Sequence, residues 1–146
     1  MRKTVIYFKS KKALDYLLKN GEVYTIRLRK RSEGLAYVKT HRKGRKIMDV
    51  VVRYVGEVML LQKLGWSVVG EVYIIGKLED FVNKSGFSSV DEWLEEVKRL
   101  NKGKLPDEIF LYHVIEESRK DEIETINEDV IDRRVRELYN KVVFGR

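Results

Sequence analysis

Apolar positions recur at two spacings along the chain, and these spacings predict short strands interleaved with short helices. An apolar run over 5–8 predicts a first strand, and apolar residues over 13–18 follow at the spacing of one helical face. This helix is expected to end at Asn20-Gly21, since both residues tolerate positive φ. Residues 23–29 then alternate as a strand. Its odd-numbered side chains are expected to share one face, and its even-numbered ones to point to the core.

The second half of the chain continues the same mixture of elements. A valine-rich strand is predicted over 47–59, with Gly56 as a bend. Ser89 and Glu92 match a capping box that opens an amphipathic helix up to about residue 100. The remaining predictions are strands over 35–40, 71–75 and 109–116, a turn region bracketed by Gly65 and Gly70, a short helix from Leu78 towards Gly86, and a loop over 103–107.

This order of elements predicts an α+β fold. The spacing of the strands suits a small, mixed and mostly antiparallel β-barrel with flanking helices. We assign 1–118 to this domain and 119–146 to a C-terminal helical extension with apolar residues roughly along one face. The extension is interpreted as packing on the domain; the alternative is that it forms a homodimer.

Composition excludes several classes of protein. The 146 residues suit one domain, and with no cysteine neither disulfides nor thiolate metal sites can form. The two histidines, His41 and His113, are too few for a multi-histidine metal site, so no metal and no cofactor are expected. The apolar run near the N-terminus is too short for a signal peptide or a membrane span, which favours a soluble, cytoplasmic protein. A charged content of 36% is typical of thermophilic proteins, although a single proline is not.

Charge is polarised along the chain. Residues 1–53 hold 16 Lys and Arg against 4 Asp and Glu, a net charge of +12. Residues 54–118 hold 7 against 12, a net of −5, and residues 119–146 are neutral with 7 against 7. A one-signed segment attracts polyanions, so the sequence predicts nucleic-acid binding. The alternative is a basic face that only confers solubility.

Two basic blocks are the candidate binding residues. The first lies within the predicted 23–29 strand and the two residues after it. There a hydroxyl beside guanidinium groups can bind a phosphate or a base edge. The second is a turn that can contact backbone phosphates. The aromatic side chains expected to stack on bases are Tyr24, Tyr37, Tyr54, Trp66 and Tyr73. The candidate nucleic-acid-binding residues are Thr25, Arg27, Arg29, Lys30, Arg31, Lys39, His41, Arg42, Lys43, Arg45 and Lys46.

Candidate catalytic groups are less well defined. Thr25 is the one candidate, and a carboxylate near it would serve as general base. Glu57, Glu71, Glu79 and Asp80 are the carboxylates considered, the last two being interpreted as solvent-facing. His113 is interpreted as a structural residue within its strand.

Two motifs resemble the ASCH domains of the PUA-like superfamily, over roughly residues 3–117. One is Asn20-Gly21 followed by Thr25-Ile26-Arg27, similar to the signature G-x-K-x-x-T-x-R; the other is Gly86-Phe87-Ser88-Ser89 leading into Trp93-Leu94. The resemblance implies a small β-barrel with a cleft for RNA or a modified nucleoside. Some members are amidohydrolases acting on acylated cytidine, and others are described as ribonucleases. The hydrolases use a lysine, a threonine and a glutamate, but Glu22 stands at the lysine position, so that activity is not carried over.

The sequence therefore predicts a nucleic-acid-binding module, with RNA as the partner and DNA as the alternative, and with no membrane partner. A nucleoside amidohydrolase or ribonuclease of the ASCH type is the alternative. A protein-interaction module that uses the C-terminal helix is the third interpretation.

Overall fold

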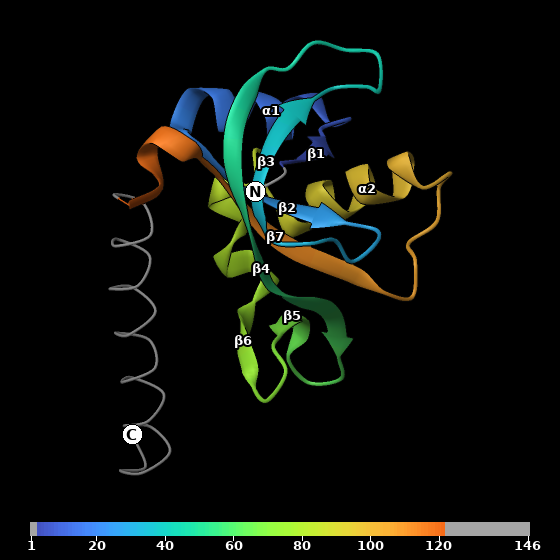
Figure 1. Ribbon diagram of the computed structural model, residues 1–146. Helices are drawn as coiled ribbons and strands as arrows, with labels where there is room; N and C mark the ends of the chain where they lie inside the picture. The colour runs from blue at the N-terminus through green and yellow to red at the C-terminus, as the bar shows by residue number, and fades with distance from the viewer. Residues whose placement is uncertain (1–2, 122–146) are drawn as a thin grey trace.

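The computed structural model describes residues 3–121, which form one mixed β-sheet with two α-helices (Figure 1). The α+β class is confirmed. Most of the predicted C-terminal extension, and its proposed packing or dimerisation, lies outside the described residues. In chain order the elements are β1 (Thr4–Tyr7), α1 (Lys11–Asn20), β2 (Glu22–Arg27), β3 (Gly34–Lys39), β4 (Met48–Leu61), β5 (Gly65–Val69), β6 (Ile74–Lys77), the 3-10 turns η1 (Leu78–Asp80) and η2 (Val82–Lys84), α2 (Val90–Leu100), β7 (Ile109–Glu116) and the 3-10 turn η3 (Glu117–Arg119).

The long strand β4 organises the sheet. On one edge it pairs antiparallel with β7, which in turn pairs antiparallel with β2. On the other edge its first half pairs with β3 and its last residues pair with β5. The register between β4 and β7 shifts between Tyr54 and Gly56, which confirms the predicted bend. A Cβ on Gly56 would lie only 2.7 Å from the carbonyl oxygen of Val69, so glycine is needed where β4 crosses β5.

The outer strands leave the sheet open. β1 pairs with β3 in parallel, and β2 pairs with β7 along one of its two edges. Within residues 3–121 no strand ladder joins β1 to β2, so the seven strands form an open sheet where the sequence predicts a barrel. β5 and β6 extend from the end of β4 as a separate flap at the bottom of Figure 1.

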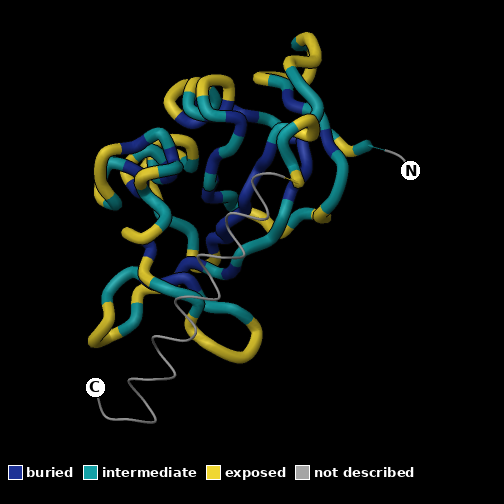
Figure 2. The backbone as a smooth tube through the Cα atoms, turned by 90° about the vertical axis from the view of Figure 1, so that its left-hand side faces the viewer, coloured by how far each residue is buried: buried dark blue, intermediate teal, exposed yellow. Residues whose placement is uncertain are grey.

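The core follows β7, where every residue from Ile109 to Ile115 is buried. Figure 2 shows the buried backbone concentrated through the middle of the fold, with exposed segments at the loop tips. β2 lies beside β7 and is covered on both faces: Val23 and Thr25 are buried on one side and Ile26 on the other. The prediction that only the even-numbered face of this strand packs in the core is therefore wrong. A strand covered by helices on one face and neighbouring side chains on the other buries both.

The predicted end of α1 at Gly21 and the predicted start of α2 at Ser89 are confirmed. The Glu92 carboxylate, however, accepts from Lys12 and Ser88 and not from the Ser89 backbone as a capping box requires. The hydroxyl of Ser10 accepts the Ala13 N–H at the start of α1, and Gly21 ends the helix at a φ of 77°. The Ser89 hydroxyl accepts the Glu92 N–H at the start of α2. The Glu92 carboxylate pairs with Lys12 Nζ at 2.8 Å, and this ion pair ties the first turn of α2 to α1.

Three local predictions are wrong. Residues 65–69, expected to be a turn, form β5, because Trp66 to Val69 can pair with the end of β4. The strand expected over 71–75 begins only at Ile74. The short helix expected after Leu78 consists of two 3-10 turns, η1 and η2. The Ser85 hydroxyl donates to the Val82 carbonyl oxygen and accepts the Phe87 N–H, and Gly86 approaches α1 closely, so the chain turns away there and does not continue as a helix.

Candidate functional site

A pocket of about 320 Å³ lies between β2, the start of α1 and one face of α2. Its lining combines four cationic side chains and one carboxylate with hydroxyls and an apolar wall. The lining residues are Phe8, Lys9, Ser10, Ala13, Thr25, Ile26, Arg27, Leu28, Arg29, Arg31, Phe87, Trp93, Glu96, Val97 and Leu100. Four of the predicted binding residues therefore meet here: Thr25, Arg27, Arg29 and Arg31.

Arg27 is a partly buried cation of the pocket. Its Nη1 donates a hydrogen bond to the carbonyl oxygen of Tyr7, and its guanidinium carbon lies 4.5 Å from the centre of the Phe8 ring. Its Nε is buried and makes no hydrogen bond within the described residues. Burial, and secondly the charge of Arg31, lower the pKa of Arg27 to about 10. The group stays protonated at neutral pH, and a partly buried, under-satisfied cation favours an anionic partner.

Arg31 forms a second link between the pocket and β1. Its Nη1 donates to the carbonyl oxygen of Val5 at 3.2 Å, and its Nη2 donates to the Thr4 hydroxyl at 2.9 Å. The Phe8 N–H donates to the carbonyl oxygen of Lys39 in β3. Because the backbone groups of successive residues point to opposite edges of a strand, the carbonyls of Val5 and Tyr7 point to the other, outer edge of β1. Arg27 and Arg31 therefore satisfy that edge with side chains, since no strand among residues 3–121 pairs with it.

The other cations divide between the rim and the exterior. Arg29 and Lys9 are exposed and line the pocket, which places them at its rim. Lys30 is not part of the lining: its Nζ lies 5.3 Å from the centre of the Tyr54 ring. Arg29 and Arg31 thus line the pocket, whereas Lys30 between them lies over the Tyr54 ring.

The apolar wall comes from the segment that joins η2 to α2. Phe87 and Trp93 are buried, and their ring planes lie 15° apart with centroids separated by 6.4 Å. Gly86 brings this segment against α1 at a φ of 91°, and a Cβ there would overlap the backbone of Lys12. None of the five aromatic residues expected to stack on bases lines the pocket. Phe8, Phe87 and Trp93 do so instead.

Glu96 is the pocket carboxylate, and the sequence reasoning missed it. It accepts a hydrogen bond from the Ser10 hydroxyl at 3.0 Å and another from Arg99 Nε. The hydrogen bond from Arg99 is the main reason that the pKa of Glu96 lies below its ordinary value; burial opposes this, and Ser10 adds to it. One signal was present in the sequence: Glu96 lies three residues after Trp93 and beside Val97, at the margin of the apolar stripe of α2.

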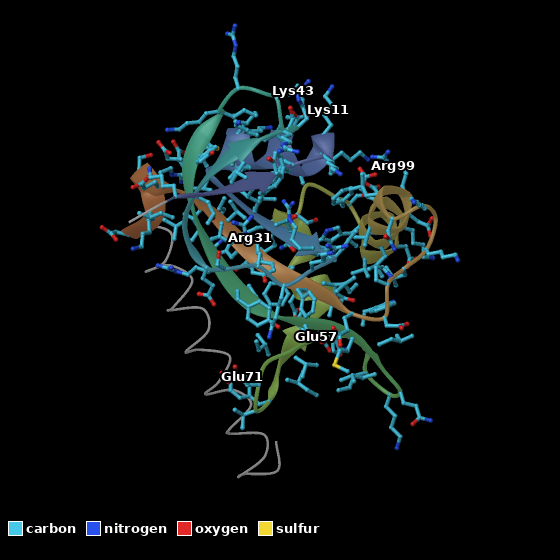
Figure 3. The ribbon with its side chains drawn as sticks, turned by 45° about the vertical axis from the view of Figure 1, so that its right-hand side comes forward. Lys11, Arg31, Lys43, Glu57, Glu71 and Arg99 are labelled. Carbon is cyan, nitrogen blue, oxygen red and sulfur yellow. The ribbon has the colours of Figure 1, made fainter. Side chains whose placement is uncertain are left out.

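The second basic block lies elsewhere. The connection between β3 and β4 carries it to the upper end of the molecule in Figure 1, and Lys43 lies at that end in Figure 3, well away from Arg31. None of Lys39, His41, Arg42, Lys43, Arg45 and Lys46 lines the pocket. Lys46 pairs with Asp49 at 2.9 Å, and Lys39 lies over the ring of Tyr37. The two basic blocks therefore form two separate surfaces.

The carboxylates considered as general bases also lie away from the pocket. Glu57 and Glu71 lie at the opposite end of the molecule from Lys43 in Figure 3. Glu79 and Asp80 are exposed, as interpreted from the sequence, and none of the four lines the pocket. None of them can serve Thr25 in this structure.

His113 is a buried structural residue, as the sequence indicates. Its Nε2 lies 2.9 Å from Glu22 Oε1, and its ring stacks on Tyr24 with centroids 4.3 Å apart. Lys84 Nζ approaches the same carboxylate at 3.5 Å. This cluster accounts for the acidic residue at the position where the ASCH signature has lysine: here Glu22 connects β2, β7 and η2.

Among residues 3–121, no cluster of three or more His, Cys, Asp or Glu is arranged to hold a metal ion. None of the helices in this part of the chain is long and apolar enough to cross a membrane. Comparison with models of known families gives no match, and comparisons with curated proteins and with solved structures give no significant match. The resemblance to ASCH domains therefore stays a prediction.

Proposed function

We propose that this protein binds RNA, with the pocket around Arg27, Arg29 and Arg31 as its main contact. The observation that carries the proposal is the composition of the lining. Lys9 joins the three arginines, and Glu96 is the one carboxylate against these four cations. Guanidinium groups bind phosphates bidentately, and aromatic walls hold unpaired bases. The pocket supplies both in one place.

The basic turn supplies a second contact in this proposal. Arg42, Lys43, Arg45 and Lys46 of this turn are exposed and lie apart from the pocket, so they contact the backbone of an extended ligand. Such contacts raise affinity without reading sequence. Two separated basic surfaces favour a strand that spans them over a small molecule that fills one.

The proposal includes a relationship to the PUA-like barrels. β1, β3, β4, β7 and β2 follow one another across the sheet, and its two free edges face each other through Arg27 and Arg31. We interpret the fold as a barrel whose last seam is bridged by arginine side chains. The pocket then lies beside that seam, where its cations hold the edge of β1.

A titration at low salt tests the proposal. The wild type, Arg29→Gln and Lys43→Gln are titrated with single-stranded RNA, tRNA and duplex DNA by fluorescence anisotropy. We expect the RNAs to bind, with both variants weaker than the wild type. No RNA binding at low salt would reject the proposal, and equal or tighter binding of duplex DNA would reassign the partner.

A nucleoside hydrolase of the ASCH type is the second candidate, because the Thr25 hydroxyl and the Glu96 carboxylate line the same pocket. Glu96 is engaged by both Ser10 and Arg99, and its lowered pKa makes it a weaker base. The candidate is tested by turnover of acylated cytidine. Turnover that survives both Thr25→Ala and Glu96→Gln would place the chemistry outside this pocket.

A further inference from the structure

The pocket carries more positive charge than a single phosphodiester needs. An internal phosphate of an RNA strand has one negative charge, whereas a phosphomonoester at a strand end is close to a dianion at neutral pH. Four cations line the pocket, and Arg99 already neutralises Glu96 from outside the lining. Charge matching therefore favours the terminal group over the internal one.

A second feature marks the inner end of the pocket. The Nε of Arg27 is a buried N–H donor with no partner among the described residues. Because this N–H is closed to solvent, Arg27 acts on an anion in the pocket through its positive charge and not through this donor. The start of α1, at Ser10, lines the same pocket, has no acidic residue in its first turn, and adds the partial positive charge of a helix N-terminus.

The size of the pocket limits what can enter. Its volume of about 320 Å³ lies at the lower end of the range for small-ligand sites. It suits one nucleotide, with the base on the apolar side of the pocket, which Phe87 and the exposed Leu100 line, and the phosphate towards the arginines. A chain end can enter such a pocket alone, whereas an internal nucleotide must keep both of its neighbours outside.

We infer that the pocket binds the phosphomonoester at the end of a single-stranded RNA, with Arg27 at its inner end and Arg29 and Lys9 at its rim. This inference rests on the proposed function and deepens it. The basic turn then contacts the strand that leads away from the pocket. Terminal recognition gives the protein a preference among RNAs that does not depend on their sequence.

Three oligonucleotides of one sequence test the inference: one with a 5′-phosphate, one with a 3′-phosphate and one with hydroxyl groups at both ends. We expect one phosphorylated end to bind about tenfold more tightly than the hydroxyl form, the effect of one charge-assisted hydrogen bond. Arg29→Gln and Lys9→Gln are expected to reduce this preference. Both side chains are exposed, so these variants are expected to fold, and thermal melting checks that they do.

Lys43→Gln is the matched control, because Lys43 is exposed and lies outside the pocket. This substitution should reduce the affinity for all three oligonucleotides by the same factor and leave the preference for the phosphorylated end unchanged. Equal affinity of the three for the wild type overturns the inference and leaves RNA binding standing, whereas no binding of any of them overturns both. If a free nucleoside monophosphate competes with the same affinity as the oligonucleotide, the assignment to a strand end is overturned, and the ligand is a mononucleotide.

Discussion

The phenol of Tyr112 holds both backbone groups of Arg31. Its oxygen accepts the Arg31 N–H at 2.7 Å and donates to the Arg31 carbonyl oxygen at 3.1 Å. Tyr112 is fully buried on the central strand β7, so a rigid element fixes the loop that carries Arg29 and Arg31. The geometry of the pocket therefore depends on a residue that does not line it.

Tyr112→Phe tests this support. The substitution keeps the ring but leaves the Arg31 N–H without its acceptor, which is expected to cost about 1–3 kcal/mol of unfolding free energy. RNA affinity should fall as well, because the loop that carries the cations loses its anchor. Urea unfolding and anisotropy measure the two effects. Tyr73→Phe is the control, since Tyr73 is 66% exposed, and an equal loss of stability there would contradict the role given to Tyr112.

Gly86→Ala tests the close approach that places the aromatic wall. The residue has positive φ, and an added Cβ would lie 2.8 Å from the carbonyl carbon of Lys12. Gly103→Ala is matched to it: Gly103 also has positive φ, at 83°, but no atom within 4 Å of an added Cβ. We expect Gly103→Ala to cost about 1 kcal/mol from the backbone alone and Gly86→Ala to cost clearly more. If thermal unfolding shows that the two variants lose the same stability, the close approach of Gly86 to α1 is contradicted.

Glu22 predicts a dependence of stability on pH. Burial pushes the pKa of Glu22 up, but the hydrogen bond and charge of His113, together with Lys84, outweigh it and hold the pKa below its ordinary value of 4.5. The folded state therefore favours the ionised form, and the resulting stability is present above pH 4.5 and lost as pH falls through the lower folded pKa. Unfolding free energy measured from pH 7 to pH 3 should fall less steeply for Glu22→Gln than for the wild type. Parallel curves would contradict the ion pair.

Glu96→Gln separates binding from hydrolysis. Ser10 and Arg99 donate to different oxygens of Glu96, so the amide keeps an acceptor for one of them, and the substitution removes the one negative charge from the pocket lining. A binding pocket for anions should gain affinity for RNA by about threefold to tenfold, the range expected for one nearby like charge. A hydrolase that uses this carboxylate should instead lose turnover. Reduced RNA affinity in this variant would argue against an anion pocket.

The sequence predicts local structure well where one residue decides it. Gly21 and Ser89 mark helix ends because a positive φ and an N-cap hydroxyl act within a few residues. Thr25, Arg27 and Arg29 could be grouped because they belong to one short stretch of chain. They line the pocket together with Ile26 and Leu28, which strand alternation places on the opposite face.

Long-range packing decides the rest. Glu96 and Trp93 reach the pocket only because α2 and β2, about 70 residues earlier in the chain, line the same pocket. The basic turn could be assigned to the same cleft only by assuming that nearness in sequence means nearness in space. In the structure the 14-residue strand β4 and its partner β3 carry the turn to a distant end. The role of Glu22, which stands where the ASCH signature has lysine, depends on its contact with His113 of the paired strand β7, which the sequence alone does not show.

The most direct test of the account is the salt dependence of RNA binding for the wild type and Arg29→Gln. Affinity of the wild type for a 5′- or 3′-phosphorylated single strand should fall steeply with ionic strength, with a log–log slope of about −0.7 for each phosphate neutralised. Arg29→Gln should bind more weakly at every salt concentration and have a shallower slope, because one phosphate contact is lost. A wild type that does not bind, or a variant with unchanged affinity and slope, would contradict the claim that these arginines form an anion-binding pocket.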